Sequence, residues 1–314
     1  MNEYQIPPVR IDSLPMTARA LSQQIDWGLR EHKMPDLWKR SAGEGVLVIV
    51  LDTGVPQHED LPVPIFTKNF TSDSSEFDRN GHQTHCSGIV AAMNNQSGVV
   101  GWAPKAHLAH IKVLGDQGGG LSTWIAAGID HAISQWRQRK HQYVGCILSM
   151  SLGGPFDRGQ EAALHRAAEA GIVVVAAAGN SGYRNGRSSV DHPGASEHTI
   201  GVAAYRSDGN IARFSSGGPE VDIAMPGEEI LSTVPGNRYQ VMSGTSMATP
   251  AAAGLLACVI ASRPTDKSIH TALGMREFLK RSVDDRGDLG KDDRFGFGVP
   301  KGSDLIRDPE YWCF

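Results

Sequence analysis

Three short motifs of this chain contain the residue types that nucleophilic catalysis by a serine requires. Ser246 lies in SGTSMATP (243–250), just before an apolar helical pattern, His82 lies in NGHQTHCSG (80–88), and Asp52 ends the apolar run of VLDTG. A serine hydroxyl is a weak nucleophile that needs an adjacent base, and that base needs an acid to orient it. A serine at the start of a helix also lies among unpaired N–H groups, which favour a developing negative charge. The motifs therefore predict acyl-transfer chemistry if the fold brings them together.

Each motif has a simpler interpretation when it is taken alone. Ser246 could cap the helix that follows it, and Asp52 could cap the next turn. His82 and His85 have the HxxH spacing of a metal pair. Two histidines rarely suffice to bind a metal, however, and HPGASEH (192–198) offers no obvious third ligand.

Apolar, β-branched runs alternate along the chain with helical patterns. This alternation predicts an α/β fold, a three-layer doubly wound sandwich with a mostly parallel central sheet. The functional site of such a sheet lies outside the carboxyl ends of its strands, where Asp52, the segment 151–154 and Asn180 all stand. The side chain of Asn180 could donate to an oxyanion there. Strands are expected at 45–52, 106–114, 144–152, 172–180 and 198–205, and helices at 84–93, 121–136, 159–171, 247–262 and near 272–282.

The composition is that of an ordinary soluble globular protein. Of the 314 residues, 40% are hydrophobic and 20% charged, and the net charge of −4 gives no sign of a nucleic-acid partner. Four cysteines in a chain of this length do not form a disulfide framework. The N-terminus has no apolar signal-peptide core and no window approaches a membrane span, so we expect a cytoplasmic location without membrane contact. Residues 1–22 are predicted to be an extension, and residues 23–314 the folded domain.

Six motifs in the same order resemble the subtilisin-type serine proteases, and the similarity runs from about residue 23 to residue 300. The motifs are VLDTG, NGHQTHCSG, NNQSGVVGWAP, MSLGGP, AAAGN and SGTSMATP. The resemblance implies a serine endopeptidase that forms an acyl-enzyme, with Asp52 as the orienting acid, His82 as the base and Ser246 as the nucleophile. It also implies that Asn180 and the backbone N–H of Ser246 bind the oxyanion.

The same resemblance implies that a protein or peptide substrate binds as an extended strand between two edges rich in glycine. These edges comprise Gly118, Gly119 and Gly120 on one side and Ser151, Leu152, Gly153 and Gly154 on the other. Taken alone, GGG would be interpreted as a flexible loop. At the base of the first specificity pocket, where many members have glycine, this chain has Asp191, which predicts cleavage after Lys or Arg. The alternative is that Asp191 turns outward and pairs with Arg184 or Arg187.

A structural calcium ion is a further implication of the resemblance. The family's calcium loop is similar to MNNQSGV (93–99). The ligands implied are the side chains of Gln23, Asp60 and Asn95 and the carbonyls of Met93, Ser97 and Val99. These are the hard oxygen ligands that calcium prefers. The alternative is a plain surface turn, since Asn-Asn and Ser-Gly form turns in any protein.

The intracellular members of the family resemble this chain in having a short N-terminal extension that lies across the active site. The segment YQIPPVR (4–10) is similar to their proline-containing motif, although Pro8 departs from it. Prolines would hold the backbone out of the geometry needed for attack, so residues 1–22 are predicted to block the cleft until they are cut. A disordered tail is the alternative.

One departure from the family pattern stands next to the expected base. Gln83 replaces the glycine that normally follows the catalytic histidine, and its longer side chain is expected to narrow the site or to slow turnover. A catalytically weakened binding protein with the same fold therefore stays open. A non-proteolytic acyl hydrolase or transferase that uses the same three residues is a further alternative.

Overall fold

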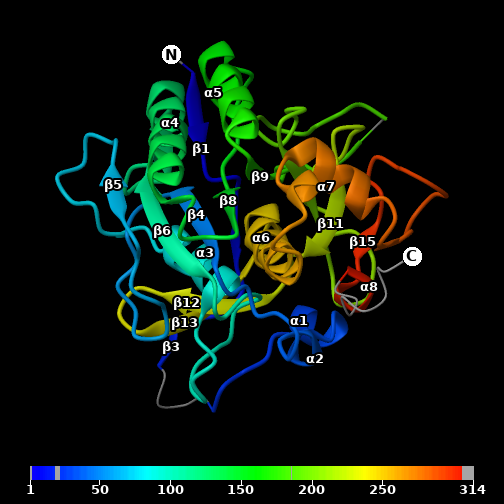
Figure 1. Ribbon diagram of the computed structural model, residues 1–314, viewed down its shortest axis with the longest axis horizontal. Helices are drawn as coiled ribbons and strands as arrows, with labels where there is room; N and C mark the ends of the chain where they lie inside the picture. Colours follow the sequence, from blue (N-terminus) through cyan, green and yellow to red (C-terminus); the bar gives the residue numbers. More distant parts are fainter. Residues whose placement is uncertain (1, 18–21, 185, 306–314) are drawn as a thin grey trace.

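The computed structural model describes residues 2–17, 22–184 and 186–305. Its centre is a seven-stranded sheet with the order β11-β10-β9-β8-β4-β6-β5, in which every neighbouring pair is parallel (Figure 1). The strands are β4 (Val46–Asp52), β5 (Thr67–Asn69), β6 (His107–Lys112), β8 (Gly145–Met150), β9 (Ile172–Ala177), β10 (Ile200–Tyr205) and β11 (Ile223–Pro226). The parallel sheet predicted from the apolar runs is therefore confirmed.

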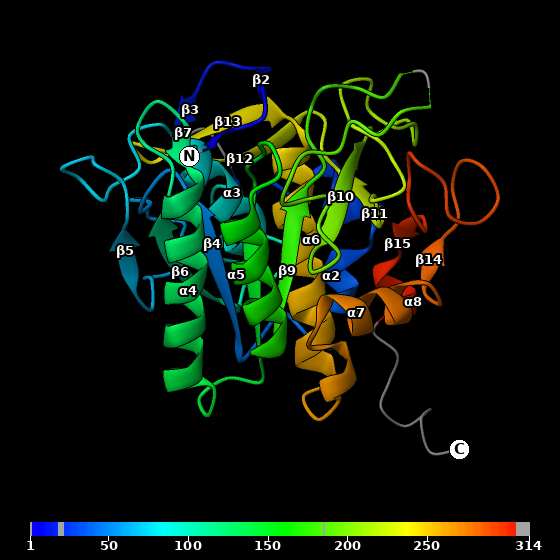
Figure 2. The ribbon, with the colours of Figure 1, turned by 90° about the horizontal axis from the view of Figure 1, so that it is seen from above.

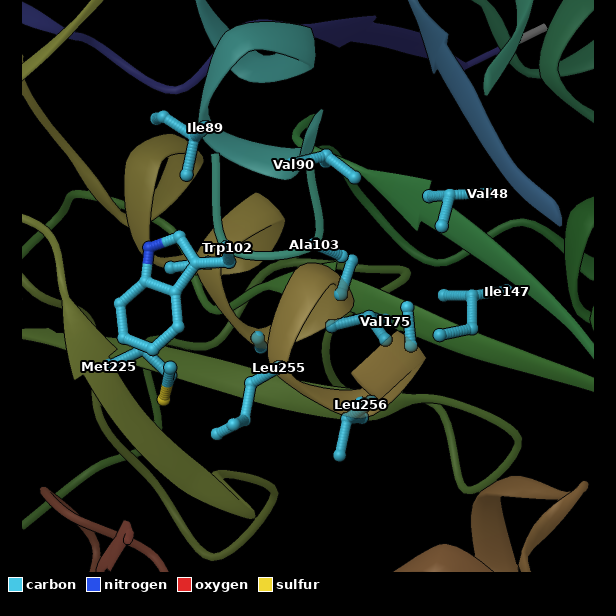
Figure 3. Close-up of a cluster of buried hydrophobic side chains, with 14 of the residues drawn as sticks. Val48, Ile89, Val90, Trp102, Ala103, Ile147, Val175, Met225, Leu255 and Leu256 are labelled. Carbon is cyan, nitrogen blue, oxygen red and sulfur yellow. The ribbon is translucent and has the colours of Figure 1, made fainter. Parts of the chain in front are cut away.

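Helices cover both faces of this sheet, as the three-layer prediction requires. On one face lie α4 (Ser122–Arg139) and α5 (Arg158–Glu169), and on the other lie α3 (His82–Ala91) and α6 (Thr245–Ser262) (Figure 1). Successive residues of a strand point to opposite faces, so β4 contributes Leu47 to the core under α4 and α5, and Val48 to the core around α6. Figure 3 shows Val48 beside Ile147 in the second of these cores, to which Leu255 and Leu256 of α6 also belong.

Helix α6 is the central helix of the larger core. It is built mainly from small and apolar residues, and all its residues from Thr245 to Ile260 are buried. Within the described ranges it is the one helix with the length and hydropathy of a membrane span, at a mean hydropathy of 1.5, and 89% of it is buried inside the protein. Pro250 is the sixth residue of this helix and removes the N–H that would bond to the carbonyl of Ser246, which accepts from the side chains of Cys86 and Ser151 instead.

Smaller sheets border the strand ends at which the site was expected. The hairpin of β12 (Ile230–Val234) and β13 (Arg238–Ser243) pairs with two N-terminal strands, β2 (Arg10–Ile11) and β3 (Met16–Thr17), which lie beside it in Figure 2. A third N-terminal strand, β1 (Glu3–Gln5), pairs with β7 (Gly119–Leu121). The remaining elements are β14 (Val283–Asp284), β15 (Val299–Pro300), α1 (Trp27–Glu31), α2 (Met34–Leu37), a 3₁₀ turn (Lys267–Ile269), α7 (Ala272–Leu279) and α8 (Gly302–Leu305).

Two differences from the expected element bounds concern the site itself. The helix expected from residue 84 begins at His82, and the helix expected from residue 247 begins at Thr245. His82 and Ser246 are therefore both inside the first turns of helices. Both helices follow a glycine. Gly81 has φ 96°, a conformation that favours glycine, whereas Gly244 is extended and a Cβ there would lie 3.1 Å from Asn180 Nδ2.

Candidate active site

Asp52 and His82 form a buried hydrogen-bonded pair at the carboxyl end of β4. His82 Nδ1 lies 2.8 Å from Asp52 Oδ1 and 2.9 Å from Oδ2, and the two side chains are 4% and 0% exposed. The backbone N–H of Thr53 also donates to Asp52 Oδ1 at 2.7 Å. Burial disfavours the protonated imidazole, but the Asp52 carboxylate outweighs it and raises the pKa of His82 well above its usual value.

Asp78 anchors the turn that leads into α3, a role that was not predicted from the sequence. Its Oδ1 accepts from the N–H of Gly81 at 2.9 Å and from the hydroxyl of Thr53 at 2.8 Å. Its Oδ2 accepts from both the N–H and the hydroxyl of Thr84. Asp78 thus joins the residue after Asp52 to the residues around His82. The only signal in the sequence was an acidic residue shortly before a helix start.

Ser246 is the second residue of α6, so its N–H is among the first four, which have no acceptor within a helix. Its Oγ donates to the carbonyl of Ser151 at 3.5 Å. Among the residues that the structure describes, Nε2 of His82 has no hydrogen-bond partner. The serine hydroxyl must therefore turn toward this nitrogen before it can transfer a proton, and such bonds are often long or open before substrate binds.

Cys86 lies against both the histidine and the serine. Its thiol donates to the carbonyl of Ser246 at 3.3 Å, and the sulfur is 3.9 Å from His82 Nδ1. Donor atoms of Asp52, His82 and Cys86 lie within 4.8 Å of one another, so a soft divalent metal could bind this trio. Burial raises the pKa of the Cys86 thiol, which keeps it protonated and a poor nucleophile.

The side-chain amide of Asn180 has a fixed orientation. Its Oδ1 accepts from the N–H and the hydroxyl of Thr245, both at 2.9 Å, which leaves Nδ2 to face the opposite way. Nδ2 donates to the carbonyl of Pro8 at 2.9 Å. Asn180 therefore presents an N–H donor beside the start of α6, and a backbone carbonyl already occupies that donor.

The two predicted substrate edges both pair with the N-terminal segment. Residues of β1 pair antiparallel with β7, and the N–H of Ile6 continues the ladder to the carbonyl of Gly118 at 3.0 Å. On the other side, Gln5 and Gly153 exchange two backbone hydrogen bonds of 3.0 and 2.9 Å. The ladder ends at Pro7, because neither it nor Pro8 has an N–H to donate.

Tyr4 fills a pocket next to these edges. Its ring lies against Gly154, and its side chain is 1% exposed. The hydroxyl donates to the carbonyl of Pro155 at 2.5 Å and lies 2.8 Å from the side-chain amide of Gln160. This pocket therefore has both an apolar wall and a polar end.

The carboxyl group of Asp191 lies beside the predicted substrate edge at Gly153, with no basic partner among the described residues. Its carboxylate packs against Gly153 and Gly179, where an added Cβ would overlap it. Within the described ranges it forms no ion pair, and Arg184 and Arg187 form a backbone bridge with each other instead. Burial raises the pKa of Asp191 to about 6. The alternative pairing with these arginines is therefore wrong for this structure.

The residues of the expected calcium loop converge on one another. Nε2 of Gln23 donates to the carbonyls of Met93 at 2.8 Å and Val99 at 3.2 Å. Nδ2 of Asn95 donates to Oδ1 of Asp60 at 2.7 Å. These are amide nitrogens facing oxygens. Rotating each amide by half a turn would leave a set of oxygens facing one another, at the cost of the bonds that Gln23 Oε1 and Asn95 Oδ1 now accept from the N–H groups of Gln96 and Ser97. The donor set therefore fits a hard cation, and the carbonyl of Ser97 lies in the same turn.

Gln83 does not face the cleft, and the expectation that it narrows the site is wrong. Its side chain is completely buried beneath the strand end that carries Asp52. Oε1 accepts from the N–H of Gly54 at 2.6 Å, and Nε2 lies 3.0 Å from His110 Nδ1. No local pattern predicts this contact, because Gln83 and His110 are 27 positions apart in the chain.

Comparisons with known proteins agree with the geometry. Residues 43–298 match the model of the subtilase family. An intracellular serine protease of Paenibacillus polymyxa is 40% identical over 83% of this chain and 81% of its own length. A thermostable alkaline protease of Halalkalibacterium halodurans is 40% identical, and subtilisin E of Bacillus subtilis is 38% identical, over 78% and 79% of this chain. The chain spans 65% and 64% of these two proteins, slightly less than two thirds.

Proposed function

The chain belongs to the subtilase family and is a subtilisin-type serine protease, and we propose that it hydrolyses peptide bonds through Ser246, His82 and Asp52. The observation that carries this proposal is the buried Asp52–His82 pair beside the start of α6, where Ser246 lies. Asp52 accepts from Nδ1 and so leaves Nε2 of the imidazole as the atom that takes the serine proton.

The proposed reaction proceeds through an acyl-enzyme. Oγ of Ser246 attacks the substrate carbonyl carbon while Nε2 of His82 takes its proton. Nδ2 of Asn180 and the N–H of Ser246 donate to the oxyanion that forms. His82 then gives the proton to the leaving amine, the peptide C–N bond breaks, and water repeats the sequence to release the acid. Asp52 stabilises the imidazolium in both halves.

We propose that Asp191 directs cleavage to the bond after Lys or Arg. Its support is a half-buried carboxylate at the glycine-lined edge, without a cationic partner among the described residues. A Lys or Arg side chain would supply the missing counter-ion, and Arg could pair with both carboxylate oxygens. A large apolar side chain would leave the charge unpaired, and acidic side chains would be repelled.

We also propose that the N-terminal extension holds the protease as a zymogen until it is cut. The pairing of β1 with β7 and with Gly153, and the bond from Asn180 to the carbonyl of Pro8, support this role. A chain that takes both substrate edges and the oxyanion donor excludes other peptides from them. The two prolines support its survival there, since they restrict the backbone through the segment that crosses the site.

A structural calcium ion and a cytoplasmic location complete the proposal. When bound, calcium would link the N-terminal side of the domain, through Gln23, to Asp60 and the loop around Asn95. The cytoplasmic location is supported by the Paenibacillus polymyxa relative, which is an intracellular serine protease.

The decisive experiment compares the wild-type chain with Ser246→Ala. The wild type should label with a fluorophosphonate and digest casein, and Ser246→Ala should do neither while keeping its melting temperature. Labelling of the wild type without digestion would indicate a non-proteolytic acyl hydrolase or transferase. The absence of both in the wild type after removal of residues 1–22 would indicate a binding protein. Substantial digestion by Ser246→Ala would show that the proposed nucleophile is wrong.

A further inference from the structure

The side chain of Gln83 bridges the backbone on both sides of Asp52. Its Oε1 accepts from the N–H of Gly54, two residues after the aspartate, at 2.6 Å. Its Nε2 donates to the carbonyl of Val50, two residues before the aspartate, at 3.2 Å. Gln83 itself directly follows His82 in α3. One side chain of α3, the helix of His82, therefore forms hydrogen bonds with the end of β4, the strand of Asp52.

The backbone groups of Gly54 and Val50 fix the orientation of this amide, and His110 lies where it can accept the remaining amide hydrogen. It lies on β6 in register with Val50, is 1% exposed, and places Nδ1 3.0 Å from Nε2 of Gln83. Burial lowers the pKa of His110 to about 3, so the ring is neutral and Nδ1 can accept. A rotated amide would set two acceptors against its oxygen at Val50 and His110, and two donors against each other at Gly54. The amide therefore has one satisfied orientation.

The backbone N–H of Gln83 adds a second tie to the same segment. It donates to the hydroxyl of Thr53 at 3.1 Å, and that hydroxyl donates to Asp78. Three consecutive residues at the end of the strand, Asp52, Thr53 and Gly54, are thus each bonded to the first turn of α3 or to the turn before it. A glycine after the histidine, the residue usual in the family, could supply the backbone tie but not the side-chain bridge.

We propose that Gln83, held by His110, is a positioning residue that fixes Asp52 relative to His82 in the proposed catalytic mechanism. It touches neither substrate nor the reacting atoms. Its loss would let the strand end shift against α3 and so weaken the Asp52–His82 bond, on which orientation and charge stabilisation of the imidazole depend. Substrate binding would not change, because the substrate edges belong to other segments.

The test compares Gln83→Leu with the double variant Gln83→Leu/His110→Leu in the full chain, with active sites counted by fluorophosphonate titration. Gln83→Leu should lower kcat per titrated site by roughly tenfold to a hundredfold with KM unchanged, and should move the acid limb of the pH–rate profile to lower pH. It should also lower Tm, because His110 loses its partner. In the double variant Tm should recover in part, since His110 no longer lacks a partner but the N–H of Gly54 still does, while kcat stays low.

Tyr205→Phe provides a control for loss of a buried hydrogen bond far from the site. Its hydroxyl contacts His32 Nε2 and Glu31 Oε2, both at 2.9 Å. This variant should lower Tm and leave kcat unchanged.

A kcat at the wild-type level in Gln83→Leu, or a kcat that recovers together with Tm in the double variant, would overturn the positioning role. This inference rests on the proposed triad, but Ser246→Ala distinguishes the failure of one from the failure of the other. Activity in Ser246→Ala would contradict the triad. If Ser246→Ala is inactive and Gln83→Leu has the activity of the wild type, only the positioning role of Gln83 is contradicted.

Discussion

His82 Nδ1 lies 2.8 Å from Asp52 Oδ1 inside a shell that excludes solvent from both side chains. Burial disfavours the imidazolium, but the Asp52 carboxylate stabilises it, and the net effect is a raised pKa of His82. The pair is therefore poised to accept a proton from the serine, and the strength of that attraction sets the pH at which the base becomes available.

The acid limb of kcat/KM should lie above pH 6.5. A general base must start neutral, and the raised pKa of His82 keeps it protonated to a higher pH than an unperturbed histidine. A pH–rate profile with a soluble peptide anilide measures this limb. Asp52→Asn should lower kcat strongly and move the limb to lower pH, because the charge that raises the pKa is removed. A wild-type limb at or below pH 6.5 would contradict the assignment.

Asn180→Ala should reduce kcat by about 10²–10³, the usual cost of losing one oxyanion donor, with little change in KM. The fixed amide of Asn180 makes this donor ready before substrate arrives, since Thr245 holds its other end. Steady-state kinetics on a chain freed of its extension gives the split between kcat and KM. A loss confined to KM would mean that Asn180 binds substrate without stabilising the oxyanion.

Deleting residues 1–22 should raise the initial rate and remove any lag in activity. Tyr4→Ala should shorten the lag of the full chain, because it gives up the buried ring and both hydrogen bonds of the hydroxyl. Glu3→Ala is the matched control, since Glu3 lies on the exposed face of the same strand. Progress curves with a chromogenic peptide provide the measurement, and an unchanged initial rate after deletion would exclude autoinhibition.

Preference for Arg over Phe at the cleaved position should increase as the pH rises through about 6. The pKa of Asp191 is about 6 because of burial, so the carboxylate is neutral at pH 5 and charged at pH 8. The measurement is the ratio of kcat/KM for two peptide anilides that differ only in the residue before the cleaved bond. The protonation of His82 affects both values equally and so drops out of the ratio. Asp191→Gly should lose both the preference and its pH dependence. An Asp191→Gly variant with the same ratio of kcat/KM as the wild type would show that Asp191 does not determine the preference for the substrate residue.

Calcium should raise Tm, and a chelator should lower it. At a calcium concentration of 100 times Kd the gain is about 2.7 kcal/mol, which corresponds to several degrees. Asp60→Ala should abolish the response, because Asp60 supplies the carboxylate of the converging set. Asp288→Ala removes an exposed carboxylate elsewhere and should keep the response. Scanning calorimetry with and without calcium measures this response. A wild-type Tm that changes with neither calcium nor chelator would contradict the site.

The sheet and its site were predictable because their signals are local. A buried parallel strand gives an apolar run, and the residue that ends the run points to the site, as Asp52 does. The two helix starts were placed two residues too late, since Gly81 and Gly244 were not recognised as the entry turns. Helix ends are the least regular part of any hydrophobic pattern.

The contacts that could not be predicted join residues far apart in the chain. Gln83 was expected to point into the cleft because its neighbour His82 does, but first-turn residues of a helix face different directions. Its true surroundings depend on His110, which sequence periodicity treats as an ordinary strand position. The pairing of Gln5 with Gly153 is equally invisible, since antiparallel partners leave no local mark.

The ladder between β1 and β7 joins two parts of one chain, so the fraction of molecules in which β1 occupies the cleft does not depend on the protein concentration. A tethered strand is present at an effective concentration that no dilution lowers, which for a short connection is in the millimolar range. A purified sample should therefore stay equally inhibited from micromolar to nanomolar protein. Once the connection is cut, the released peptide becomes a separate ligand that is lost on dilution and regained at high concentration. Dilution alone would thus distinguish an intact chain from one already cleaved.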